Sequence, residues 1–201
     1  MSEKTIQEIE AAFGERAAGI LRGWHDAQDE IGCEIESVEG PHADILTDRQ
    51  PAEIAHTQKA ERAGAKADEY RREYQALMEE RNEAVRTRTR ELREQLFGVQ
   101  DADGLARAAL ASDAGLGSML ELAVHAGNAE LGRAVFTAAE QRGLGDLMNR
   151  YFDQMNPEAG ALYQEFKAAP SEEGLERRLA DAETIFAAPD ASYFAPAFAR
   201  L

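Results

Sequence analysis

Apolar residues recur at a seven-residue spacing along the first part of the chain. The residues at this spacing are Ile6, Phe13, Ile20 and Ala27. A second apolar series, Ala17, Trp24 and Ile31, follows the last three of them by four residues each. Because such a pattern gathers side chains on one stripe of a helix, it predicts an amphipathic helix over residues 3–31. The predicted helix seam consists of Ile6, Phe13, Ile20, Trp24 and Ile31. The partner of this seam is either another part of the chain or a second copy.

Three glycines, Gly14, Gly19 and Gly23, fall inside this predicted helix. Each costs up to about 1 kcal/mol relative to alanine, so we expect them to allow close approach of a neighbouring helix. The helical period ends at Gly32, and the stretch from there to Gln50 has neither the period nor the length of another helix. We expect a linker or one short strand there, so that the first segment comprises residues 1–50.

A second long helix is predicted from Pro51 to Phe97, where Gly64 is the one glycine and no further proline occurs. At 1.5 Å per residue this helix would be roughly 70 Å long. Its apolar line is narrow and consists of Tyr70, Tyr74, Leu77, Met78, Val85, Leu92 and Leu96. Such a helix is either solvated over much of its circumference or packed against neighbouring copies through arginine and glutamate. A helical hairpin is one arrangement of the two long helices.

Short helices separated by glycine or proline are predicted for residues 98–188. Asn128 and Ser171 are placed as N-caps, and Gly127 and Gly143 as C-caps. Most of the larger apolar side chains lie here: Leu120, Leu122, Val124, Leu131, Val135, Phe136, Leu144, Leu147, Tyr151, Phe152, Leu162, Phe166, Leu179 and Phe186. We expect them to form the core of a compact helical domain. Since aromatic residues make up only 7% of the chain and strands favour such residues, the predicted fold is all-α.

The last segment, residues 189–201, has a different composition. Pro189 and Pro196 favour an extended path, and the apolar anchors along it are Tyr193, Phe194, Phe198 and Leu201. An extended arm with such anchors can dock in successive pockets. It either folds back over its own helical domain or docks on another subunit or protein.

The formal net charge of −16 opposes general binding to nucleic acid or to an anionic membrane. Both need a surface rich in lysine and arginine. Cys33 is the one cysteine, so no disulfide can form within the chain. No run approaches the about 20 apolar residues that span a bilayer, and no signal-peptide pattern opens the sequence. We expect no membrane contact and a cytoplasmic protein, or one assembled from cytosolic components.

Motifs for catalysis and metal binding are weak or missing. Glu53 and His56 form one Glu-x-x-His, the spacing that puts both side chains on one helical face in di-iron bundles. Such sites need two of these motifs, and the predicted helices hold no second one. Neither a nucleophile elbow nor a glycine-rich phosphate loop occurs. We therefore predict no catalytic residue, no metal and no cofactor, and a protein that is not an enzyme.

Five arginines stand against two glutamates in residues 81–93, RNEAVRTRTRELR. One face of the predicted helix carries Arg86, Arg90 and Arg93, and another carries Arg81 and Arg88. Arginines that surround a helix fit ion pairing better than groove binding to nucleic acid. Partners are available three or four residues away on the helix and in the acidic residues 1–40. Pairing is the favoured hypothesis, and contact with nucleic acid is the other.

Three segments carry a resemblance to a known family: the helix from Pro51 to Phe97, the helical body from Asp101 to Ala188, and the arm with Tyr193, Phe194, Phe198 and Leu201. Together they resemble the head-to-tail connector or adaptor proteins of tailed bacteriophages. The resemblance is one of layout. It implies a ring of copies packed side by side under the portal, with the C-terminal extension reaching into it.

This resemblance implies homo-oligomers that are assembled in the host cytoplasm and located in the virion. The implied partners are portal or other virion proteins, and nucleic acid would be met only in a DNA channel. A scaffolding protein or another virion component stays open. The alternative hypothesis is an α-helical adaptor or regulatory module that binds a single cellular protein.

Overall fold

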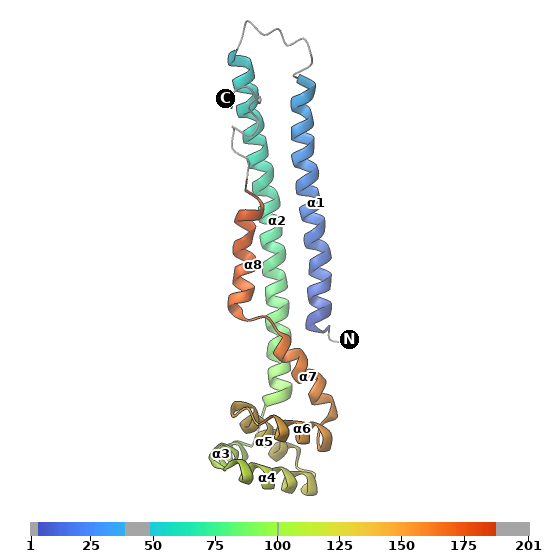
Figure 1. The fold of residues 1–201 in the computed structure, drawn as a ribbon, viewed down its shortest axis with the longest axis vertical. Helices are drawn as coiled ribbons and strands as arrows, with labels where there is room; N and C mark the ends of the chain where they lie inside the picture. Colours follow the sequence, from blue (N-terminus) through green and yellow to red (C-terminus); the bar gives the residue numbers. More distant parts are fainter. Residues whose placement is uncertain (1–3, 39–48, 100, 188–201) are drawn as a thin grey trace. The chain divides into compact units, whose positions relative to one another are not determined.

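The computed structural model describes residues 4–38, 49–99 and 101–187, with side chains for 4–31, 57–99 and 101–187. Within these ranges the chain forms eight α-helices and no strand, which confirms the all-α prediction. The helices are α1 (Ile6–Val38), α2 (Arg49–Phe97), α3 (Ala102–Leu110), α4 (Asp113–Ala126), α5 (Ala129–Gln141), α6 (Gly145–Gln154), α7 (Pro157–Ala168) and α8 (Glu172–Ile185), as Figure 1 shows.

The first helix is longer than its apolar pattern predicts. It continues through Gly32 to Val38, so residues 32–38 are neither linker nor strand. One glycine costs a helix only about 1 kcal/mol, which neighbouring helical turns outweigh. The second helix begins at Arg49, and this start places Pro51 in the first turn, where a missing N–H is tolerated.

The chain divides into two compact units that differ from the four predicted segments. Of the described residues, one unit holds 4–6 and 84–170, and the other holds those from 7–83 and 171–187. We call the first the short-helix unit and the second the long-helix unit. The division falls inside α2, between Glu83 and Ala84, and it assigns α8 to the long-helix unit.

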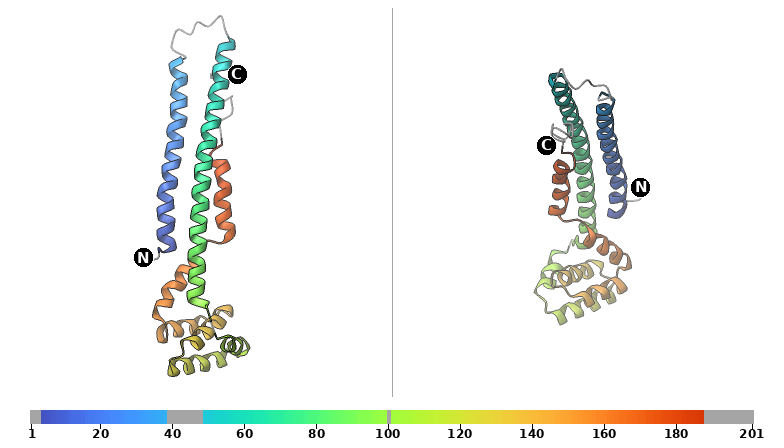
Figure 2. Two further views of the ribbon diagram at one scale, coloured as in Figure 1. Left: turned by 180° about the vertical axis from the view of Figure 1, so that it is seen from behind. Right: turned by 45° about the horizontal axis from the view of Figure 1, so that its top comes forward.

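In the long-helix unit α1 and α2 run antiparallel side by side, and α8 lies along α2 (Figures 1 and 2). An aromatic cluster joins the three helices. The ring of Trp24 lies 6.0 Å from that of Tyr70 and 6.3 Å from that of Phe186, which in turn lies 5.4 Å from Tyr74. The expectation that α8 belongs with the short helices is therefore corrected, because Phe186 is fully buried against α1 and α2.

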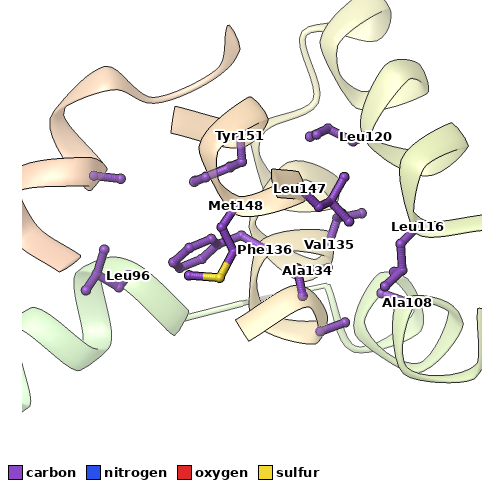
Figure 3. Close-up of a cluster of buried hydrophobic side chains, with 13 residues drawn as sticks. Leu96, Ala108, Leu116, Leu120, Ala134, Val135, Phe136, Leu147, Met148 and Tyr151 are labelled. Carbon is purple, nitrogen blue, oxygen red and sulfur yellow. The ribbon is translucent and has the colours of Figure 1, made fainter. Parts of the chain in front are cut away.

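The short-helix unit packs α3 to α7 and the end of α2 around Phe136 (Figure 3). The Phe136 ring stacks on Tyr151 at 4.9 Å and on Phe97 at 5.4 Å. Most of the predicted core residues of these helices are buried or half-buried, but Leu122 is 61% exposed. It lies on the opposite face of α4 from Leu120, which is fully buried.

The predicted N-caps Asn128 and Ser171 and the predicted C-cap Gly127 are confirmed, whereas the C-cap of α5 is Arg142 and Gly143 follows it. The side chain of Asn128 accepts a hydrogen bond from the Leu131 amide at 3.0 Å, and that of Ser171 accepts one from the Gly174 amide. Gly127 and Gly143 have φ of 60° and 70°, the left-handed region that favours glycine at helix ends.

Candidate interaction site on the long helices

Arg81 lies inside the long-helix unit, although it belongs to the arginine-rich stretch. The residue is 1% exposed, and its guanidinium makes a two-pronged contact with the carboxylate of Glu10 on α1. The Nε to Oε2 distance is 3.0 Å. Two parallel hydrogen bonds between planar groups fix the orientation of both side chains. The pair therefore sets how α1 and α2 are aligned along their length.

The same contact extends to α8. Arg178 donates to Glu10 at 3.3 Å, and Arg81 donates from Nη1 to the side-chain oxygen of Asn82 at 2.8 Å. Asn82 is buried, and its amide nitrogen donates to the carbonyl of Leu175 at 3.2 Å. All three helices are thus joined by one connected set of hydrogen bonds, and those made by Arg81, Arg178 and Glu10 are charge-assisted.

Arg88 has the corresponding place in the short-helix unit. It is 6% exposed and donates from Nε and Nη2 to the two oxygens of Glu165 on α7, at 2.9 and 3.0 Å. Its Nη1 also lies 3.6 Å from Glu91, the pair expected three residues away. Glu165 accepts a further hydrogen bond from the Ile6 amide at 2.9 Å. Hydrogen bonding from Arg88, reinforced by the Ile6 amide, lowers the pKa of Glu165 although burial opposes this.

The other three arginines of this stretch are exposed. Arg90 donates to the hydroxyl of Thr87 at 3.2 Å, and the guanidinium of Arg93 lies over the ring of Phe166, 5.9 Å from its centroid. Arg86 is exposed and has an interaction partner of its own. The two faces that the sequence indicates therefore differ in burial. Arg81 and Arg88 are buried on one face, and Arg86, Arg90 and Arg93 are exposed on the other.

The predicted helix seam is largely buried. Ile6, Phe13, Ile20 and Trp24 are at most 9% exposed, and Ile31 is half-buried. Ile9, which is only 7% exposed, completes the stripe. It is missing from the prediction because it lies outside the seven-residue series.

The partners Glu10 and Glu165 were not predicted as site residues. The only sequence signal for Glu10 is its position beside the apolar stripe in an acidic segment. No sequence signal marks Glu165, since its partner lies 77 residues away along the chain.

A groove of about 510 Å³ runs between α1 and α2 in the long-helix unit. The first helix contributes Arg16, Gly19 and Ile20. The second contributes Tyr70, Glu73, Ala76, Leu77 and Glu80. Arg16 and Glu80 form an exposed ion pair across one end, with a closest distance of 3.0 Å. The groove therefore combines an apolar floor with a charged rim, the composition of a protein-binding surface.

Several predicted site residues lie outside the described part of the chain. These are the arm anchors Tyr193, Phe194, Phe198 and Leu201. The side chains of Glu53 and His56, whose single Glu-x-x-His is too weak to predict a metal site, also lie outside it. Among the side chains that are described, no group of three or more His, Cys, Asp or Glu could hold a metal ion. In the same part of the chain, every helix is too short or too polar to cross a membrane.

Comparisons with protein families, with curated proteins and with solved structures give no match.

Proposed function

We propose that the chain is a non-enzymatic assembly protein whose copies associate through the exposed face of α2. A head-to-tail connector of a tailed phage is the particular structure that we propose it builds, with portal or other virion proteins as partners. The observation that carries the proposal is the uneven distribution of charge along α2.

Exposed charges of opposite sign predominate at the two ends of the described part of α2. Residues 57–83 contain seven exposed acidic residues and three exposed basic residues, which gives these exposed residues a net charge of −4. The acids are Glu61, Asp68, Glu69, Glu73, Glu79, Glu80 and Glu83, and the bases are Arg62, Lys66 and Arg72. Residues 84–97 contain three exposed basic residues and one exposed acidic residue, a net charge of +2. They are Arg86, Arg90, Arg93 and Glu94.

This distribution favours staggered association of copies. The basic end of one α2 is attracted to the acidic stretch of the next, whereas aligned parallel copies would bring like charges together. A contact between two different patches leaves one patch of each kind open, so that further copies add until a ring closes. Such charges set register and partner choice, and exposed pairs are screened by salt.

Mass measurement over a range of salt concentrations tests the proposal. We expect oligomers at low salt that dissociate as the ionic strength rises. The variant Arg86→Glu with Arg90→Glu should lose association at low salt, because it removes the basic end. Combining it with Glu61→Arg and Glu79→Arg should restore association, because the two patches are then exchanged.

A control variant separates this patch from the overall charge. Arg22→Glu with Arg107→Glu changes the net charge equally at exposed positions on α1 and α3. We expect it to associate as the wild type does. A chain that stays monomeric at every salt concentration, or a stable one-to-one complex with a single cellular protein, would contradict the proposal.

A further inference from the structure

We propose that the groove between α1 and α2 binds residues 188–201 of a second copy. This inference rests on the proposed function and names the contact that would hold its copies together. The occupant is a segment of the chain outside the described residues, and it follows directly after Ala187.

The groove suits aromatic side chains. Ile20, Leu77 and Tyr70 form its floor, and its volume of about 510 Å³ lies within the roughly 300–1,000 Å³ of pockets that enclose small ligands. At Gly19, an added Cβ would meet no atom within 4 Å. Space is therefore open where a side chain of α1 would otherwise stand, and an inserted ring can contact the floor.

The segment has the matching composition. Tyr193, Phe194 and Phe198 provide three aromatic rings, and no other part of the chain outside the described residues contains such a cluster. Its one cation, Arg200, can pair with Glu73 on the rim. Aromatic anchors in a groove with a charged rim are the usual source of affinity and specificity in protein interfaces.

The position of α8 favours a second copy over the same chain. On α2, Arg71 and Tyr74 contact Phe186, the C-cap of α8, and Asn82 contacts Leu175 within that helix. At 100° per residue, their mean direction lies about 140° from that of the groove residues. The residues facing α1, Tyr70 and Arg81, lie between the two directions, so α1 blocks the shorter way round.

The longer way round α2 exceeds the reach of the segment's first anchor. A helix with side chains is about 10–12 Å across, so a path over its outer surface measures about 25–30 Å when the segment's own width is included. Tyr193 follows Ala187 by six residues, which span at most about 20–22 Å. Within one chain this anchor falls short of the groove, whereas the segment of a second copy has no such limit.

A pair of glycine substitutions tests the groove in the full chain. Gly19→Leu fills it, while Gly14→Leu makes the same change at an exposed glycine that does not line it. Both remove a helical glycine, so both chains should fold. We expect Gly19→Leu to weaken association by about tenfold or more, as loss of an anchor contact does, and Gly14→Leu to leave it unchanged. Equal association of the two variants would overturn the inference and leave the proposed function standing.

Mixing two defective chains tests the assignment to a second copy. One chain carries Gly19→Leu, and the other carries Phe194→Ser with Phe198→Ser. At a concentration where each variant alone is monomeric and the wild type associates, the intact segment of the first fits the intact groove of the second. The mixture should therefore form a dimer and stop there, because the remaining groove and segment are both defective. A mixture that stays monomeric would overturn the assignment to a second copy. A wild-type chain that never associates would instead contradict the proposed function itself.

Discussion

At the scale of single residues, two arginine–glutamate pairs join α1 to α2 and differ in burial. Arg81 is buried and its partner Glu10 is half-buried, whereas both side chains of the Arg16–Glu80 pair are more than half exposed. Removing Arg81 leaves a cavity, takes the two-pronged bond from Glu10 and takes the Nη1 donor from the buried Asn82 oxygen. We therefore expect Arg81→Ala to lower the free energy of unfolding by about 3–4 kcal/mol, although Glu10 keeps its contact with Arg178. Arg16→Ala should produce little measurable change, since solvent already screens that pair. Urea unfolding of both variants checks the contrast, and equal losses would contradict it.

Glu165 gives the short-helix unit a defined dependence on pH. Arg88 and the Ile6 amide hydrogen-bond its charged form, so its pKa is lowered in the folded state. The resulting stability is present above the ordinary pKa of a glutamate and is lost as the pH falls through the lowered value. We expect Glu165→Gln to cost about 2–3 kcal/mol at neutral pH, the strength of hydrogen bonds to a charged group.

The difference between Glu165→Gln and wild type should then narrow in acid. Urea unfolding at about pH 7 and about pH 3 measures it, because the stability contributed by the charged Glu165 carboxylate declines as the pH falls below the ordinary pKa of a glutamate. Glu94→Gln, at an exposed position of α2, serves as the control. A loss of stability that is the same at both pH values would show that Glu165 acts through packing and not through its charge.

At the scale of the helix, the glycines of α1 differ in what surrounds them. An added Cβ at Gly23 would lie 3.0 Å from Cε1 of Tyr70. An added Cβ at Gly14 or at Gly19 would have no atom within 4 Å. Replacing a helical glycine by alanine gains up to about 1 kcal/mol where space allows. We expect that gain for Gly14→Ala and Gly19→Ala, and none for Gly23→Ala. Thermal unfolding of the three variants measures it, and an equal gain at Gly23 would mean that Tyr70 moves aside at no cost.

The helices themselves could be predicted because their signals are local. The apolar spacing of α1, the cap residues Asn128 and Ser171, and the pair Arg88–Glu91 all involve residues at most a few turns apart. The contacts between helices could not be predicted in the same way. Whether Arg81 pairs with Glu10 or with any other carboxylate depends on which helices pack together, and exposed glutamates are abundant.

The sequence-based prediction that α8 packs with the short helices was wrong for the same reason. Its buried stripe, Leu175 and Ala182 with Phe186 at the C-cap, has an ordinary amphipathic spacing that fits any apolar surface. Only the position of Trp24 and Tyr74 on the long helices selects its partner. The groove was likewise hidden in the sequence, because Gly19 and Ala76 mark it by lacking large side chains.

At the scale of the whole molecule, the described cores end before the C-terminal segment begins. Among the described residues, Phe186 is the last that is buried, and aromatic rings of α1 and α2 contact it. Deleting residues 190–201 removes none of the described buried side chains. We therefore expect the shortened chain to keep its helix content and its cooperative unfolding, and to lose association because the occupant of the groove is gone.

Circular dichroism, urea unfolding and mass measurement of this deletion variant separate folding from assembly. Because the segment would act on a neighbouring copy, the free energy of unfolding at concentrations where the wild type is monomeric should be the same for both chains. Above that range, only the wild type should gain stability with concentration, since association stabilises the folded state by mass action. A deletion variant that is less stable even as a monomer would show instead that the segment completes the core of its own chain.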